Sequence, residues 1–93
     1  MLIILTKNSF FIIEKPVRIY KASIKGTLIK NYNLIIEDDQ RHKFFILSSD
    51  CLDTIDRGYI TICDRIKWNI KSKSPDPFID FTNYEEGKQE CCF

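Results

Sequence analysis

Several ingredients that particular protein classes need are scarce or missing in this sequence of 93 residues. Its three glycines lie far apart, at positions 26, 58 and 87, so no glycine-rich phosphate-binding loop is present. The four cysteines, at positions 51, 63, 91 and 92, show none of the Cys-x-x-Cys spacing of zinc and redox sites. No apolar run approaches the roughly 18 residues that a membrane-spanning helix needs.

Catalytic signals are equally sparse. The single histidine, His42, follows an acidic, polar segment, where a surface position is more common than a role as a base. There is no Gly-x-Ser-x-Gly motif, and no pair of carboxylates stands in clearly different surroundings. The acidic cluster Glu37–Asp39 lacks the oxygen-rich loop pattern that calcium needs. We therefore expect a protein that is not an enzyme, with no catalytic residue, no metal site and no cofactor.

The charges nearly cancel, with 14 basic and 13 acidic residues. This balance excludes a polybasic binder and an acidic mimic of nucleic acid. No basic segment precedes the apolar residues 1–5, so a secretory signal is not expected. With no secretory signal and no N-glycosylation sequon, we expect a cytoplasmic protein. Usage rich in isoleucine, lysine and asparagine is typical of AT-rich genomes, such as those of phages, and if a phage encodes the protein the cytoplasm is that of the host cell.

What the sequence has in abundance is residues that favour strands. β-branched and aromatic residues account for 34 of the 93, whereas alanine, leucine and methionine together account for eight. Branched and aromatic side chains suit a pleated, half-buried surface. The forty-four percent of hydrophobic residues also excludes a wholly disordered chain.

Alternation and turn residues predict the order of the elements. Residues 2–5 and 10–14 form one hairpin, and residues 34–37 and 43–47 form another around a polar tip. Between them, residues 17–30 alternate as one long strand bent at Gly26. A short helix covers residues 50–57 and ends at Gly58, followed by strands at 59–73 and 78–82.

These elements indicate one all-β domain, mainly antiparallel, over residues 1–82, with one short helix and a polar, flexible tail at 83–93. Short strands at regular spacing are typical of a small barrel or sandwich. The bent strand at residues 25–28, the segment 45–47 and the pattern Leu52…Gly58-Tyr59-Ile60 also resemble part of an OB-like barrel. In the strand at 59–73, Trp68 shares the even face with Ile60 and Ile62, so we expect it to be buried.

The near-neutral total hides separate charged blocks. Residues 1–36 carry +5, residues 37–64 carry −4, residues 65–73 carry +4 and residues 74–93 carry −4. Within the predicted strands, the basic residues fall on the faces opposite the apolar ones. The candidate nucleic-acid-binding residues are Lys21, Lys25, Arg65, Lys67, Lys71 and Lys73.

Two functions remain open at this point. If the two basic faces lie close together, the protein is a small binding module for single-stranded DNA or RNA, since cations in a row follow a phosphate backbone. The simpler interpretation of the same lysines is a solvated face that prevents aggregation. The alternative function is a protein-interaction module, such as an inhibitor, immunity or accessory protein. It would bind a protein partner or a second copy through an exposed sheet edge, at residues 2–5 or 10–14.

Overall fold

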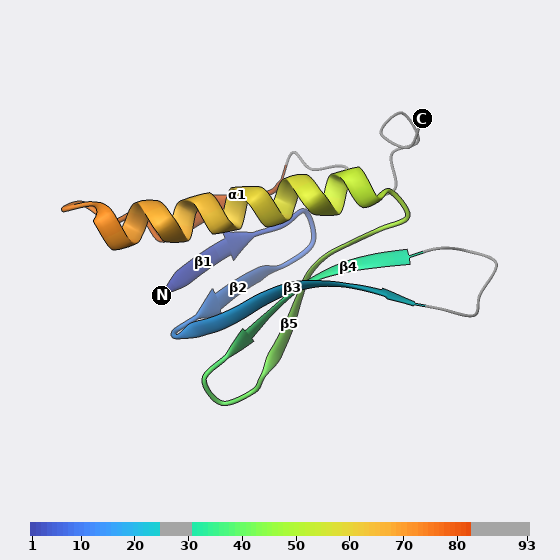
Figure 1. Cartoon of the computed structure of the whole chain (residues 1–93), viewed down its shortest axis with the longest axis horizontal. Coiled ribbons are helices and arrows are strands. Elements are labelled where there is room, and N and C mark those ends of the chain that lie inside the picture. Colours follow the sequence, from blue (N-terminus) through green and yellow to red (C-terminus); the bar gives the residue numbers. More distant parts are fainter. Residues whose placement is uncertain (25–30, 83–93) are drawn as a thin grey trace.

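A computed structural model describes residues 1–24 and 31–82 of the chain (Figure 1). This part is mostly β-structure with one helix, as predicted. The predicted bend at Gly26 and the predicted tail at residues 83–93 lie outside the described residues. In chain order, the elements are β1 (Leu2–Leu5), β2 (Phe10–Ile13), β3 (Pro16–Ile24), β4 (Asn31–Asp38), β5 (Lys43–Ser49), α1 (Leu52–Lys71) and β6 (Phe78–Asp80).

The strands form two sheets of three strands each. In the first, which we call the N-terminal sheet, β1 lies between the antiparallel β2 and the parallel β6. In the second, which we call the meander sheet, β3, β4 and β5 follow one another antiparallel. Both predicted hairpins and the mainly antiparallel pairing are confirmed. The sheets do not close on each other within the described residues, so the predicted barrel, OB-like or otherwise, is not confirmed.

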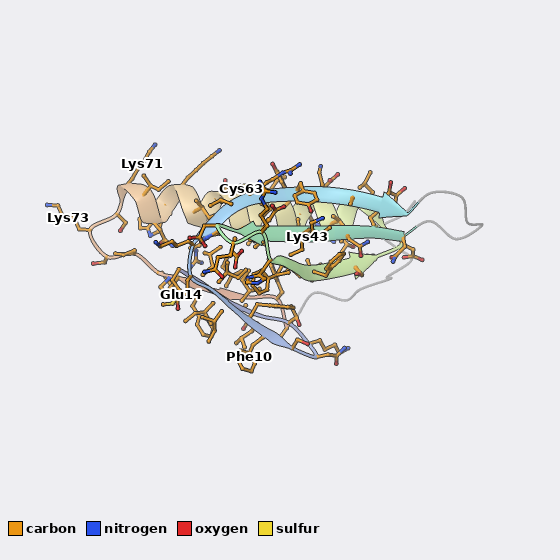
Figure 2. The ribbon with its side chains drawn as sticks, turned by 90° about the horizontal axis from the view of Figure 1, so that it is seen from below. Phe10, Glu14, Lys43, Cys63, Lys71 and Lys73 are labelled. Atoms are coloured by element: carbon orange, nitrogen blue, oxygen red, sulfur yellow. The ribbon has the colours of Figure 1, made fainter. Side chains whose placement is uncertain are left out.

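The hydrophobic core lies where the two sheets and one side of α1 meet. Seen from below, the meander sheet lies in front of α1, which covers its far face (Figure 2). Phe11 and Phe44 join the two sheets, with their rings edge to face and their centres 6.3 Å apart. The buried members of the core are Leu2, Ile4, Ile13, Leu34, Ile36, Ile46, Leu47, Ile55, Ile62, Ile79 and Phe81.

The helix is the main departure from the sequence prediction. The predicted strand at residues 59–73 is wrong, because α1 continues without a break from Leu52 to Lys71. Ile62 and Ile66 lie four residues apart, a spacing that fits both one face of a strand and one face of a helix. Gly58 does not end the helix. It lies buried within the helix.

Trp68 is also placed differently from the prediction. Its side chain is 59% exposed, whereas the prediction buried it with Ile62. A period of two residues puts residues 60, 62 and 68 on one face of a strand. The helical period of 3.6 residues per turn instead spreads them around the helix. Ile62 is fully buried on the helix, while Ile60 is 56% exposed, so the helical period decides which residues pack.

Two alanine substitutions in α1 test this placement. Ile62→Ala should lower the free energy of unfolding by about 2–5 kcal/mol, because it removes buried methyl groups and leaves a cavity. Ile60→Ala should change it by less than about 0.5 kcal/mol, because this side chain lies in solvent. Urea unfolding followed by circular dichroism measures both. Equal losses from the two substitutions would mean that residues 60 and 62 share one buried face, as in a strand.

Candidate functional site

Of the six cations of the predicted nucleic-acid surface, the five that the structure describes are not brought together on one sheet. Lys25 lies outside the described residues. Lys21, on β3, donates a hydrogen bond to Asp56 of α1, with Nζ 2.7 Å from Oδ1, and lies 5.1 Å from the centre of the Tyr59 ring. The hydrogen bond and the negative charge of Asp56 raise the pKa of Lys21, although desolvation partly opposes this. Lys21 therefore ties α1 to the edge of the meander sheet.

Arg65 is likewise engaged within the protein. Its guanidinium lies 2.6 Å from the carboxylate of Asp76 and donates a hydrogen bond of 2.8 Å to the carbonyl oxygen of Phe78. Asn69, one helical turn later, exchanges hydrogen bonds with the backbone of Asp76 through both side-chain atoms. These contacts hold the segment that leads into β6 against α1, which gives Arg65 a structural task.

The remaining three cations lie at and beyond the C-terminal end of α1. Lys67, Lys71 and Lys73 are exposed, and Figure 2 shows Lys71 and Lys73 pointing away from one end of the molecule. None of the three forms an ion pair with another described residue. The prediction placed Lys67 and Lys71 on one face of a strand. That part of the prediction is wrong, because the two residues lie one helical turn apart on α1. The exposed Trp68 lies between them in the sequence.

A second surface is formed by the N-terminal sheet. In β1 and β2 the residues alternate between the core and the opposite side, and both sets are apolar. The side that faces away from the core, which we call the outer face, has two rows. Ile12, Ile3 and Phe78 form one row, and Phe10, Leu5 and Asp80 form the other.

Three of these residues are exposed to solvent. Phe10 is 66% exposed, Ile12 51% and Phe78 44%. Figure 2 shows Phe10 at the lower margin of the molecule, pointing away from the meander sheet. Sheets with one solvated side normally carry polar residues there, so a contiguous group of isoleucine, leucine and phenylalanine is unusual.

The edges of this sheet differ from each other. Of the two strands predicted as an exposed edge, β1 lies inside the sheet, and β2 forms the edge. The opposite edge, β6, has only three residues and follows Pro77, which has no N–H group to donate. Strand β2 contains no proline and no charged residue, the features that usually protect an edge from further pairing.

At the acidic hairpin tip, Asp38 stabilises the turn between β4 and β5. The carboxylate of Asp38 accepts hydrogen bonds from the backbone N–H groups of Gln40 and His42, at 2.9 and 2.8 Å. Desolvation of the Asp38 carboxylate acts to raise its pKa. The hydrogen bonds from the backbone and the contact with the His42 ring act to lower it and outweigh desolvation, so the pKa of Asp38 is lowered. Within residues 1–24 and 31–82, no three His, Cys, Asp or Glu side chains are close enough to hold a metal ion.

The outer face was missed by the sequence analysis, although a signal for it was present. Residues 2–5 and 10–13 contain no polar residue, so neither strand has a side suited to water. Such continuous apolar strands are typical of sheets covered on both sides. The composition alone does not say that only one side of this sheet is covered by the chain.

Comparisons with protein-family models, with curated proteins and with solved structures gave no match. In the part of the chain that the structure describes, no helix combines the length and the apolar character needed to cross a membrane.

The exposure of Trp68 can be measured directly, because it is the only tryptophan. Its fluorescence in the native protein should be red-shifted and readily quenched by acrylamide, close to the values in urea. Trp68→Ala should change the free energy of unfolding by less than about 0.5 kcal/mol, since an exposed side chain leaves no cavity. A blue-shifted, protected emission would place Trp68 in the core instead.

Proposed function

We propose that this protein is a non-enzymatic protein-interaction module that binds a partner through the outer face of its N-terminal sheet. The observation that supports this most is the exposure of Phe10 and Ile12 on an edge strand, beside Ile3, Leu5 and Phe78. All five belong to one face of one sheet, so a single flat partner surface can cover them together.

The size of the outer face fits the centre of an interface. A buried aromatic side chain removes about 150–250 Å² from water, so the exposed parts of Phe10 and Phe78 alone amount to about 200 Å². At about 25 cal/mol per Å², covering that area contributes about 5 kcal/mol before the costs of association. A standard interface needs about 800 Å² from each partner, so polar residues around the outer face would form its rim.

The flanking residues supply such a rim. Lys7 and Asn8 lie in the turn before β2, Glu14 and Lys15 follow it, and Asp80 lies at the end of the second row. An apolar centre inside a ring of mixed charges is the usual anatomy of a specific interface. The unprotected edge of β2 also allows a partner strand to extend the sheet.

Site-specific photo-crosslinking tests the proposal in the cells that express the protein. A benzophenone amino acid at position 12 should give discrete crosslinked products, because Ile12 lies in the middle of the outer face. The same group at position 57 is the matched control, since Arg57 is exposed on α1. The product from position 12 should disappear when Phe10→Lys is added.

Phe10→Lys should leave the free energy of unfolding within about 0.5 kcal/mol of the wild-type value, because Phe10 lies largely in solvent. Loss of the crosslink can then be attributed to the interface rather than to unfolding. The same pattern of products from positions 12 and 57, or none from position 12, would contradict the proposal.

A second candidate function is the binding of single-stranded nucleic acid at the C-terminal end of α1. The observation in its favour is the exposed Trp68 among Lys67, Lys71 and Lys73, since an aromatic ring and neighbouring cations can hold a base and its phosphates. Two of the six predicted cations, Lys21 and Arg65, are neutralised within the protein, which leaves this candidate the weaker of the two.

Salt dependence tests this second function. Three phosphate contacts should give a slope of about −2 in log affinity against log salt, at about −0.7 for each contact. Lys71→Glu combined with Lys73→Glu should remove most of the binding to a short oligonucleotide at low salt. Lys7→Glu combined with Lys43→Glu is the control with the same change of net charge elsewhere. Equal losses of oligonucleotide binding from both pairs of substitutions would indicate that only the overall charge of the protein attracts the nucleic acid.

A further inference from the structure

The edge of β2 carries backbone groups whose direction follows from the hairpin turn. The N–H of Thr6 donates to the C=O of Ser9 at 2.8 Å, so these two residues form a hydrogen-bonded pair. Such pairs alternate with unbonded pairs along an antiparallel ladder, so the next residue of β2 that bonds to β1 is Phe11. The N–H and C=O groups of Phe10 and Ile12 therefore point away from β1, out of the sheet.

The bonds between β1 and β6 give the same result independently. Ile3 donates its N–H and Leu5 accepts with its C=O on the side of β6, each at 2.8 Å. These are the two residues of β1 that lie opposite Ile12 and Phe10, so neither pair is joined by hydrogen bonds. No other strand of the described chain lies beyond β2, so its edge offers two donors and two acceptors.

The two sheets have four edges within residues 1–24 and 31–82, and the other three carry features that discourage pairing. Strand β3 begins with Pro16 and is interrupted by a bulge. Strand β5 begins with Lys43 and has an irregular register against β4. Strand β6 is short and follows Pro77. An apolar edge without such protection is a template for another strand, and native proteins normally cover it.

A second copy of β2 matches this edge. When a two-fold axis perpendicular to the sheet relates two antiparallel β2 strands, Phe10 of each copy can lie opposite Ile12 of the other, with the two Phe11 residues meeting at the axis. Each Phe10–Ile12 pair then exchanges two hydrogen bonds, so all the outward backbone groups of both residues are satisfied. An aromatic ring beside a β-branched side chain is also a favourable cross-strand pair. A register shifted by two residues would instead place Glu14 or Asn8 opposite an apolar side chain.

This pairing closes on itself. The two N-terminal sheets become one sheet of six strands, with β6 and its preceding Pro77 at both ends. Because each copy uses its open edge, none remains for a third copy, and a dimer forms rather than a filament. Outside the strand, Lys7 of one copy comes near Glu14 and Lys15 of the other, and this mixed set of charges neither drives nor prevents the contact.

We propose that the protein forms a homodimer in which β2 pairs antiparallel with β2 of a second copy, with Phe11 at the two-fold axis. The dimer goes beyond the function proposed above, because it uses the edge of the N-terminal sheet and leaves the outer faces open. It places the two outer faces side by side on one sheet, so a partner that covers both buries about twice the apolar area.

Sedimentation equilibrium tests the dimer and its hydrogen bonds, and the wild-type protein should show a reversible monomer–dimer equilibrium at micromolar concentrations. Ile12→Pro should raise the dimer dissociation constant about tenfold or more, because it removes one donor from each of the two symmetric pairs. The bonds between β2 and β1 are kept, since the N–H of Ile12 points outward. Ile12→Ala is the matched control, which shortens the side chain but retains the N–H, and it should have the smaller effect. Circular dichroism verifies that each variant is folded.

A charge exchange tests the register without removing a hydrogen bond. Phe10→Glu and Ile12→Lys should pair with each other more tightly than either variant pairs with itself, because the new carboxylate and ammonium lie directly opposite. Phe10→Glu mixed with Phe10→Lys is the control, since these positions are diagonal neighbours and should gain less. Native mass spectrometry distinguishes the mixed dimer from the two homodimers by mass.

Phe78→Lys separates the dimer from the interaction of the outer face. Phe78 lies on β6, at the opposite edge of the N-terminal sheet, so this substitution should leave the dimer dissociation constant unchanged while weakening the binding of a partner to the outer face. Crosslinked products that contain peptides of this chain alone identify the second copy.

Four outcomes would overturn the proposal. The first is a protein that stays monomeric at high micromolar concentrations, and the second is a dimer that Ile12→Pro weakens no more than Ile12→Ala does. The third is a dimer lost with Phe78→Lys, which would mean that two outer faces stack on each other. The fourth is the absence of any preference for the mixed dimer of Phe10→Glu and Ile12→Lys.

Discussion

The structure depends on a single core that three layers share. Ile4 from β1, Leu34 and Ile36 from β4, and Ile62 from α1 all belong to one buried cluster. In a chain this short, one cluster of this kind must supply most of the stabilisation. The N-terminal sheet contributes one side to this core, although its strands β1 and β2 are apolar on both sides. The other side of that sheet is exposed to solvent, at Phe10 and Ile12 above all.

Side chains of the same type therefore have different roles in this structure. Lys21 and Arg65 look like surface cations in the sequence, but each holds α1 to a neighbouring segment, through Asp56 and Asp76. Lys67, Lys71 and Lys73 have no such task among the described residues. Of the candidate cations that the structure describes, those without an ion pair therefore lie near the C-terminal end of the helix. Isoleucines divide in the same way, with Ile62 in the core and Ile12 in solvent.

The sequence was sufficient to predict the strands whose pattern is local. Both hairpins, the small polar turns and the predominance of antiparallel pairing follow from residue type and alternation. It was insufficient for residues 59–71, where isoleucines four apart match two periods at once and Gly58 is compatible with a helix end. Only the packing of that segment against two sheets chooses the helix. The outer face also depends on which layer covers which, and this is a property of the tertiary arrangement.

The pairing of β1 with β6 has a consequence for how the chain folds during synthesis. Ile3 lies beside Phe78, so the first strand cannot gain its second neighbour until almost all of the described chain has emerged from the ribosome. The meander and α1 involve closer segments and can form earlier, because local contacts close smaller loops. During that interval β1 has an unpaired side, and a nascent chain with an apolar, unpaired strand is prone to aggregate. The three residues of β6 therefore end the period in which the newly made protein is most vulnerable.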